Sequence, residues 1–534
     1  MRICFLLFIV PSLAQIHPQI FRGSQAESLL LNNKKQMDWD ASRGSSRVLA
    51  MSSEYGEMHK MKKGSKMSRM MMKAIKPLET SPVDPPSNDQ QKPSLPYSNS
   101  PHSGETQTMY LDLFSGIVGS AVYTPGTIYY QAAEWIINLD EQTLDINDPT
   151  LSQRYLLALF YYTTTQNGQP KWRSCNPVGN NEAEFSNQDC IYDKFISRAV
   201  NDTFEFQGFP AKRWLSSSPE CEWAGVTCNE FNFVTKLELF GQNIAGTLPT
   251  EIAVLPYLQS IALIYNNFTG TIPSEYGTIK NLNNLELHIN LLTGTIPDEL
   301  WNAVEMIRFN VNENMLTGTV STKIGRLSKL LGFFISDNMY TGTLPTEIGN
   351  AGLLTYMRFD SNSLSGNLPT WLGQCTQLKE LWAQNNDWTG TIPSELGLLQ
   401  ELVNFRVNSA QISGTIPDSL YNLGKLSRLD MSDLTLTGTL STYIGNLVSL
   451  VDLRIQGNKL SGTIPSEIAN LYSLKRAWLH LNLFEGSVPV EICVNRQYEL
   501  EFLQADCDPL DAPANACECC TACCDRDTEI CTIK

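Results

Sequence analysis

Histidine is scarce in this chain of 534 residues, and no set of catalytic side chains accompanies the five that are present. A glycine-rich phosphate loop, an HExxH motif, a GxSxG motif and the signature motifs of protein kinases are all missing from the sequence. These absences predict a protein that is not an enzyme and that needs neither a cofactor nor a metal ion at its functional site.

Basic residues are also in short supply. Lys and Arg total 39 against 55 Asp and Glu, which gives a formal net charge of −16. Because affinity for nucleic acid depends on clustered cations, we expect no nucleic-acid partner. The chain is not an acidic disordered tail either, since 42% of its residues are hydrophobic and can form a core.

No apolar run reaches the ~20 residues that a membrane-spanning helix needs. The start of the chain is typical of a secretory signal, because Arg2 precedes a short apolar segment and Ser12-Leu13-Ala14 fits the small-x-small cleavage rule. We therefore expect residues 1–14 to be a signal peptide and the mature protein to be secreted. An uncleaved amino-terminal anchor, which would hold the protein at a membrane or cell wall, is the alternative.

Cysteine is nearly absent from the middle of the chain, where Cys375 stands alone and is expected to be a buried free thiol. The remaining cysteines of the mature chain gather near its two ends, which indicates disulfide-stapled ends in an oxidising compartment. Disulfides are expected at Cys175, Cys190, Cys221, Cys228, Cys493 and Cys507, with the first two closing a loop. Pairing among the last six cysteines is left open, and binding of a soft metal by thiolates is the alternative there. Two glycosylation sequons begin at Asn201 and Asn267.

Residues 15–107 are rich in Ser, Pro, Gln, Met and Lys and contain no repeat, which predicts a disordered linker or propeptide. Within them, residues 58–76 carry seven Lys or Arg residues among six methionines. If helical, this segment would suit an anionic membrane, glycan or mineral surface, while a solvated linker is the simpler interpretation.

The dominant feature is a glycine that recurs every 24 residues, eleven times without a slip, from Gly246 to Gly486. Nine and seven residues before each glycine stand mostly large apolar residues, such as Leu285 and Leu287, and this alternation predicts a short strand with one buried face. Residues two before and two after the glycine are apolar as well. We therefore assign residues 236–499 to eleven repeats that remove their apolar side chains from water only by stacking.

Four residues before the glycine stands an asparagine in eight of the repeats, and we expect these amides to form a ladder that satisfies backbone groups of the turns. Ala410 and Leu434 interrupt this column in adjacent repeats. Two interpretations stay open for this stretch, a functional hinge or a substitution compensated by packing. The eight asparagines are Asn266, Asn290, Asn314, Asn338, Asn362, Asn386, Asn458 and Asn482.

These columns resemble the plant-type leucine-rich repeat, LxxLxLxxNxLxGxIPxxLxxLxx, which Asn290-Leu291-Leu292-Thr293-Gly294-Thr295-Ile296-Pro297 shows directly. The resemblance implies an α/β solenoid, a right-handed horseshoe with a parallel sheet on its concave face and a second, lateral sheet. Residues 108–235 would be a helical amino-terminal cap, with amphipathic helices expected over 131–139 and 152–163. Residues 500–534 would be a Cys-rich tail that caps the carboxyl-terminal end. The segment from Cys221 to Cys228 resembles the plant-type cap, which implies a disulfide between these two cysteines. The helix around Trp135 and the CxCCxxCC tail are most similar to extracellular, receptor-like leucine-rich-repeat proteins of diatoms.

The outward positions of the expected concave strands are free to vary and therefore carry binding information. In the second half of the repeats they are rich in Arg and Trp, the residue types that dominate binding hot spots. The candidate ligand-binding residues are Arg308, Phe334, Tyr356, Arg358, Trp382, Arg406, Arg428, Asp430, Arg454, Arg476 and Trp478. The competing interpretation is that several of these charges simply pair with one another across strands.

Three functions follow from this arrangement. The leading hypothesis is an extracellular recognition protein, similar to a receptor ectodomain, that binds a protein, peptide or glycan on the concave face. The second is a structural adhesion component of a wall or matrix. The third, ice binding, rests on a threonine that follows the glycine in nine repeats, although threonine also simply favours strands. The oligomeric state is left open.

Overall fold

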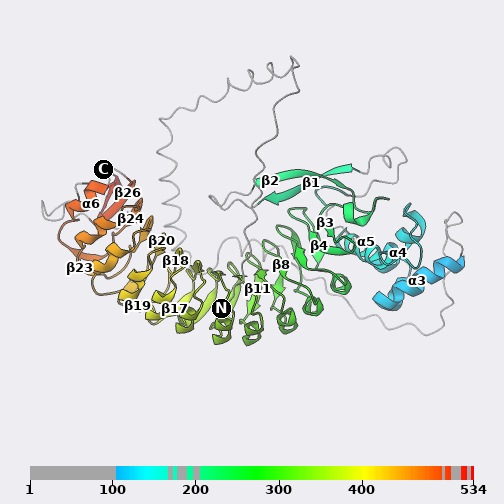
Figure 1. Cartoon of the computed structure of the whole chain (residues 1–534), viewed down its shortest axis with the longest axis horizontal. Coiled ribbons are helices and arrows are strands. Elements are labelled where there is room, and N and C mark those ends of the chain that lie inside the picture. The colour runs from blue at the N-terminus through cyan, green and yellow to red at the C-terminus, as the bar shows by residue number, and fades with distance from the viewer. Residues whose placement is uncertain are drawn as a thin grey trace, which may run out of the picture. The chain divides into compact units, whose positions relative to one another are not determined.

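The computed structural model describes residues 104–165, 172–176, 189–196, 205–495, 499–506, 517, 519–525 and 531–533, all within one compact unit, Lys92–Lys534. Figure 1 shows this unit as a curved row of similar coils with helices at its amino-terminal end. The expected signal peptide, the basic segment 58–76 and the sequon at Asn201 lie outside the described residues. Within the described residues, no helix is both long and apolar enough to cross a membrane.

One sheet of fifteen strands runs the length of the repeats and lines the inner side of the curve (Figure 1). The eleven repeats, here called coils 1 to 11, each contribute one parallel strand, in a register shifted by 24 residues from coil to coil. These strands are β4 (Val234–Glu238), β6 (Ser260–Ala262), β8 (Asn284–Glu286), β10 (Arg308–Asn310), β12 (Gly332–Phe334), β14 (Tyr356–Arg358), β16 (Glu380–Trp382), β18 (Asn404–Arg406), β20 (Arg428–Asp430), β22 (Asp452–Arg454) and β24 (Arg476–Trp478).

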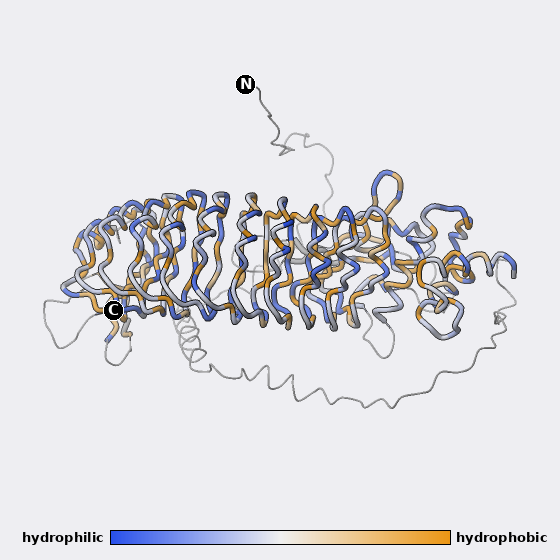
Figure 2. Tube along the Cα trace, turned by 90° about the horizontal axis from the view of Figure 1, so that it is seen from below, coloured by the Kyte–Doolittle hydropathy of each residue, from blue (hydrophilic) through white to orange (hydrophobic). Residues whose placement is uncertain are grey.

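The predicted columns of apolar residues form the core. Leu285 and Leu287 are fully buried, and Ile296 is partly buried against the same cluster. Figure 2 shows the same alternation of apolar and polar segments recurring from coil to coil. Each coil therefore removes its apolar side chains from water by lying against its neighbours, as the repeat pattern predicts.

A second set of short strands lies beside the glycines and forms one sheet of five strands and three pairs. A Cβ on Gly294 would lie 2.8 Å from Cγ2 of Thr271, one coil earlier, so the threonine column packs its methyl groups against the following glycines. This packing gives the threonine column a structural role. The strands are β5 (Ala245–Thr247), β7 (Asn267–Thr269), β9 (Thr293–Gly294), β11 (Met315–Gly318), β13 (Met339–Gly342), β15 (Ser363–Asn367), β17 (Asp387–Thr389), β19 (Ser413–Gly414), β21 (Thr435–Leu436), β23 (Ser461–Thr463) and β25 (Leu483–Glu485).

Each of the first ten coils then returns through one turn of 3-10 helix that starts after a proline or, in two coils, after a serine that caps it. Proline suits this position because it needs no hydrogen-bond partner for its nitrogen. The helices are η4 (Thr250–Val254), η5 (Ser274–Thr278), η6 (Asp298–Asn302), η7 (Thr322–Arg326), η8 (Thr346–Asn350), η9 (Thr370–Gln374), η10 (Ser394–Leu398), η11 (Asp418–Asn422), η12 (Thr442–Asn446) and η13 (Ser466–Asn470).

The asparagine ladder is present as predicted. The Nδ2 group of Asn290 donates to the carbonyl of Leu263 at 2.9 Å and to that of Leu287 at 3.0 Å, and its Oδ1 accepts from the backbone of Phe268 at 3.1 Å. Asn386 and Asn482 make the same two kinds of hydrogen bond. Their Nδ2 groups donate to the carbonyl 27 residues earlier in the chain, and their Oδ1 atoms accept from the backbone N–H 22 residues earlier. Each amide therefore joins two successive coils where backbone groups would otherwise be buried without partners.

The gap at Ala410 is compensated by a side chain of the preceding coil. The carbonyl that an asparagine at position 410 would reach is that of Ala383, and the indole Nε1 of Trp388 donates to it at 2.7 Å. At the second interruption of the asparagine column, the side chain of Leu434 is buried. The paired strands of the second sheet at this place, β19 and β21, are only two residues long. These contacts favour compensation by packing over a hinge.

Helices cap the amino-terminal end: α3 (Gly104–Val118), α4 (Ile128–Glu134) and α5 (Leu151–Thr165), with the one-turn helices η1 (Gly119–Tyr123), η2 (Trp135–Leu139) and η3 (Glu220–Glu222). Three expectations need correction. The cap begins at Gly104, before the boundary expected at residue 108, and the helix expected over 131–139 is α4 followed by a π-helical turn, η2. Moreover, α5 is buried on nearly every side rather than amphipathic, because the helices and the first coil enclose it.

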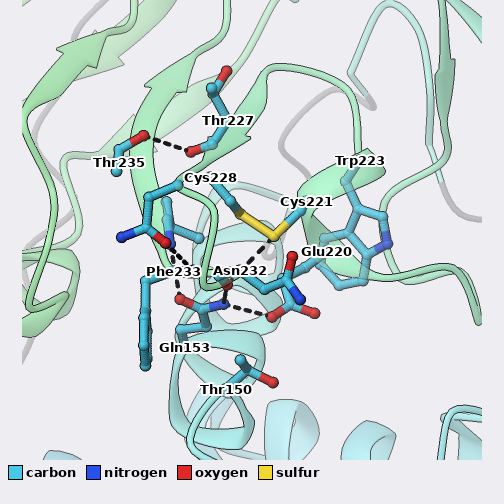
Figure 3. Close-up of a disulfide and its surroundings, with 12 residues drawn as sticks. Thr150, Gln153, Glu220, Cys221, Trp223, Thr227, Cys228, Asn232, Phe233 and Thr235 are labelled. Atoms are coloured by element: carbon cyan, nitrogen blue, oxygen red, sulfur yellow. Dashed lines mark hydrogen bonds between the residues drawn. A yellow bond between two sulfur atoms is a disulfide. The ribbon is translucent and has the colours of Figure 1, made fainter.

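A hairpin of β1 (Asp189–Ile196) and β2 (Glu205–Lys212) follows, and β3 (Val226–Cys228) then joins the main sheet antiparallel to β4. The expected disulfides Cys175–Cys190 and Cys221–Cys228 are both formed. Figure 3 shows the second, beside which Gln153 of α5 donates to Glu220 and to the carbonyl of Asn232.

The carboxyl-terminal residues, expected to form a Cys-rich cap of the solenoid, extend the main sheet. After α6 (Val490–Asn495), the strands β26 (Phe502–Asp506) and β27 (Ala522–Cys524) continue it in parallel, and β28 (Cys531–Ile533) closes it antiparallel.

Cys493 is in a disulfide, as expected, and its partner is Cys519, while Cys507 lies outside the described residues. Two further disulfides join Cys517 to Cys520 and Cys524 to Cys531. Cys375 is a buried free thiol, as expected.

Candidate ligand-binding face

The register of the main sheet brings the candidate residues into one row. Because side chains alternate along a strand, the middle of β18 buries Phe405 while Asn404 and Arg406 face outward. Successive strands align Arg358, Trp382, Arg406, Asp430, Arg454 and Trp478 side by side on the inner face. Residues dispersed over more than a hundred positions thus share one surface.

Arginines and aromatic rings alternate along the first part of this row. Phe334 has the guanidinium carbons of Arg308 and Arg358 at 4.8 Å and 5.7 Å from its ring centre. Trp382 has those of Arg358 and Arg406 at 3.8 Å and 4.3 Å. These cation–π contacts form a continuous ladder over five strands and hold its side chains in place.

The other end of the row includes a residue that the sequence analysis missed. Arg454 lies 4.4 Å from the ring centre of Trp478, whose ring in turn lies 5.1 Å from that of Phe502. Phe502 belongs to β26, beyond the last glycine of the repeat, so the 24-residue period gave no signal for it.

Carboxylates neutralise several of the arginines. Asp452, only 1% exposed in its side chain, is approached by Arg428 at 3.4 Å, Arg454 at 3.2 Å and Arg476 at 3.1 Å. Farther along, Arg358 pairs with Glu380 at 2.7 Å. Among the candidate residues themselves, only Arg454 and Asp430 approach each other, at 4.0 Å, within the described chain. The other arginines pair with Glu380 and Asp452, and these pairs hold them in a framework.

Arg406 is different. Within the described residues it has no carboxylate at ion-pair distance, and its buried Nε has no hydrogen-bond partner. Burial and the charge of Arg428 lower the pKa of Arg406, which indicates that its charge is poorly compensated. Nearby polar atoms are buried without partners too, namely Nε1 of Trp382, Oε1 of Gln384 and Oδ1 of Asn404. Hydrogen-bond donors and acceptors that have no partner among the described residues thus lie close together around β16 and β18.

Three carboxylates follow the strands of coils 4, 5 and 6 at one rim of the face, here called the acidic rim: Glu313, Asp337 and Asp360. The backbone N–H of Glu313 donates to the carbonyl of Ser336, and that of Asp337 to the carbonyl of Asp360, so the three lie in consecutive coils. Burial raises the pKa of each, and the charge of Asp337 adds to the effect on its two neighbours. For Asp360, burial raises the pKa to about 6, although Ser336 Oγ donates to it at 2.5 Å.

Asp360→Asn is expected to stabilise the protein at pH 7.5 by about 1–2 kcal/mol and to have less effect at pH 4. The pKa of this carboxyl is higher in the folded chain, so the folded state gains stability from protonation that is lost as the pH rises through 6. Asparagine keeps an oxygen that can accept from Ser336 and removes the buried charge. Urea unfolding at both pH values tests this, and an equal gain at pH 4 and 7.5 would contradict it.

Two other candidate binding sites lie outside the inner face. A cleft of about 630 Å³ between the hairpin and the amino-terminal cap is lined by Asp189, Tyr192 and Lys212 among others, but its one basic group, that of Lys212, is paired with Asp189 at 2.7 Å. His480 lies within 4.8 Å of the sulfurs of Cys524 and Cys531, yet these two are joined in a disulfide and offer no thiolate to a metal ion. The inner face is therefore the best candidate site.

Comparison with known proteins agrees with this architecture. The leucine-rich repeat family model matches residues 449–471. A structure of the plant peptide hormone receptor RGFR1 in complex with RGF2 is similar to this chain with a TM-score of 0.50 and 33% identity, covering 51% of this chain and 43% of the receptor. The repeat block is a leucine-rich-repeat solenoid.

Two further relatives resemble parts of the solenoid. The leucine-rich-repeat ectodomain of the Arabidopsis receptor kinase HAESA, in complex with an extended IDA peptide hormone, has a TM-score of 0.50 and 29% identity over 53% of this chain and 47% of that one. A probable leucine-rich repeat receptor-like protein kinase of Arabidopsis thaliana is 46% identical over 54 residues, or 10% of this chain and 6% of the kinase. The chain therefore spans less than half of each of these relatives.

Proposed function

We propose that this solenoid is an exported recognition protein that binds an extended ligand along its inner face, with an acidic group of the ligand at Arg406. The observation that carries the proposal is the group of buried, unpartnered polar atoms around Trp382 and Arg406. Burying such atoms without partners is costly, so a surface that keeps them is better explained by a ligand that completes their hydrogen bonds.

Further support comes from the rigidity of the surroundings. The neighbouring arginines are already held by Glu380 and Asp452, so the face is organised before a ligand arrives. Two receptor structures that are similar in fold, RGFR1 with RGF2 and HAESA with an IDA peptide hormone, favour a peptide among the possible ligands. The disulfides near both ends of the described chain suit an extracellular location, free or anchored.

Arg406→Ala and Trp382→Ala are each expected to weaken binding about 10- to 30-fold, because both residues occupy the centre of the face, where truncation has its largest effects. The measurement is titration of the highest-affinity hit from peptide and oligosaccharide arrays. Lys425→Ala is the matched control, since its ammonium group pairs with Glu401 on an exposed surface away from the row. Unchanged affinity in both inner-face variants would remove the proposed site.

The competing function is structural adhesion, in which the solenoid contributes stiffness and the ends make the contacts. A protein of that kind would give no selective hit on either array. Binding to isolated wall or matrix material that persists in the double variant Trp382→Ala/Arg406→Ala would favour adhesion instead.

A further inference from the structure

We infer that the disulfide between Cys524 and Cys531 is a thiol-exchange site, at which an external thiolate attacks Cys531 and becomes covalently attached there. The disulfide lies at the carboxyl-terminal end of the main sheet, beyond β24 and β26 (Figure 1), where β27 and β28 place the two cysteines directly opposite each other. This inference concerns a chemical modification, and it does not depend on the ligand proposed for the inner face.

The two cysteines differ in accessibility. The side chain of Cys524 is fully buried, whereas Cys531 is partly exposed. A thiolate attacks a disulfide in line with the sulfur–sulfur bond, so it approaches the attacked sulfur from the side opposite to the leaving sulfur. Cys531 is therefore the sulfur that a thiolate from solvent reaches, and Cys524 is the leaving group.

Two neighbours of Cys524 can stabilise a departing thiolate. Nε2 of Gln504, a residue that is only 9% exposed, donates a hydrogen bond to Sγ of Cys524 at 2.9 Å. A ring nitrogen of His480 lies within 4.8 Å of both sulfurs, and Nδ1 of this imidazole is buried with no hydrogen-bond partner among the described residues. N–H groups beside a thiolate lower the pKa of its thiol, and a thiol of lower pKa leaves faster.

His480 acts here as a neutral donor, because burial lowers its pKa to about 4. A neutral imidazole carries one N–H, which a thiolate can accept. On the neighbouring strand, the carboxylate of Asp506 accepts from the backbone N–H groups of Leu481 and Asn482 at 2.6 Å and 3.2 Å. These hydrogen bonds hold its negative charge at the turn after β24.

The exchange balances without an oxidant or a reductant. The incoming thiolate forms a new sulfur–sulfur bond to Cys531 while the bond between Cys531 and Cys524 breaks. The electron pair of the broken bond stays on Cys524, whose thiolate accepts the hydrogen bonds of Gln504 and His480. Attack by Cys524 on the new bond restores the original disulfide, so the attachment is reversible.

The disulfide between Cys221 and Cys228 provides a matched comparison. It has the same sequence separation of 7 residues, and both of its cysteines are partly exposed. However, Sγ of Cys221 lies 3.4 Å from the carbonyl oxygen of Asn232 (Figure 3). A carbonyl oxygen carries partial negative charge and disfavours a thiolate beside it, so we expect this disulfide to exchange more slowly.

The test incubates the whole chain with reduced glutathione at neutral pH and quenches samples with iodoacetamide, which blocks each freed thiol. Mass spectrometry of peptides prepared without reduction then maps both modifications. We expect glutathione on Cys531 and alkylation on Cys524, formed at least about 10-fold faster than any modification of Cys221 or Cys228.

Variants test the two donors. Gln504→Met and His480→Leu should each slow the exchange about 10-fold and raise the pH midpoint for alkylation of the freed Cys524, because each removes an N–H. Gln504→Glu keeps the size but replaces the donor by a carboxylate, so it should slow the exchange further. His288→Leu is the matched control, since His288 holds the same place in coil 3 and its Nδ1 is likewise buried without a hydrogen-bond partner in the described chain. Thermal melts confirm that each variant is folded.

Equal exchange at the two disulfides would overturn the inference, as would glutathione attached to Cys524 instead of Cys531. Rates that stay unchanged in both Gln504→Met and His480→Leu would also overturn it, because these side chains are what distinguishes this disulfide from that of Cys221 and Cys228.

Discussion

Replacing Arg154 by methionine is expected to lower the free energy of unfolding by about 3–5 kcal/mol, because it removes one member of a buried ion cluster. Arg154 is fully buried in α5 and binds Asp140 through two nitrogens at 2.6 Å and 2.7 Å and Glu220 at 3.2 Å. Its remaining hydrogen bonds go to the backbone carbonyls of Ser216 and Ser218.

The packing around Arg154 explains why no other residue can take its place. The guanidinium carbon lies 5.2 Å and 4.8 Å from the ring centres of Trp135 and Trp223, so a planar cation is held between aromatic faces and carboxylates. Lysine has neither the flat shape nor enough donors for these partners, so Arg154→Lys should also be strongly destabilising.

Urea unfolding followed by tryptophan fluorescence measures this effect. Arg326→Met is the matched control, since Arg326 is exposed and bonds only to the side chain of Asn302. Adding Asp140→Asn and Glu220→Gln to Arg154→Met should recover part of the loss, because the buried carboxylates then no longer lack a cation. A loss below about 1 kcal/mol in Arg154→Met would mean that the cluster contributes little.

Asn290→Ala is expected to destabilise the repeat block by about 3 kcal/mol, since three backbone groups in coils 2 and 3 lose their partners at once. The amide is buried and serves Leu263, Leu287 and Phe268. The control is Asn446→Ala on the exposed end of η12.

Hydrogen exchange gives a local readout for the same variant. Faster exchange should be confined to coils 2 to 4, because each amide joins only neighbouring coils. An unchanged midpoint of unfolding, together with unchanged hydrogen exchange of the backbone N–H of Phe268, would contradict a stabilising role for the asparagine ladder.

The repeat block could be predicted from the sequence almost completely. Every apolar column points inward, and every asparagine four residues before the repeat glycine indicates the same turn, so eleven copies reinforce one interpretation. The row of outward-facing residues could be predicted as well. Side chains alternate between the two faces of a strand, so the burial of residues such as Leu285 and Leu287 determines which residues face outward.

Features outside the period could not be predicted in the same way. The partner of Cys493 depends on how the last residues fold back, and the seven cysteines after it allow many pairings. Nothing in the sequence around Arg154 marks it as buried, because its partners lie on other elements. The contrast between paired Arg358 and unpaired Arg406 likewise depends on which carboxylates the neighbouring strands bring within reach.

The hydrogen bond from the indole of Trp388 to the carbonyl of Ala383 couples coil 7 to the alanine at position 410 of coil 8. An asparagine at position 410 would compete with the indole for this carbonyl, which also accepts from Nδ2 of Asn386 at 3.2 Å. The effects of Ala410→Asn and of a smaller residue at position 388 on the free energy of unfolding should therefore be non-additive, although the two residues belong to different coils.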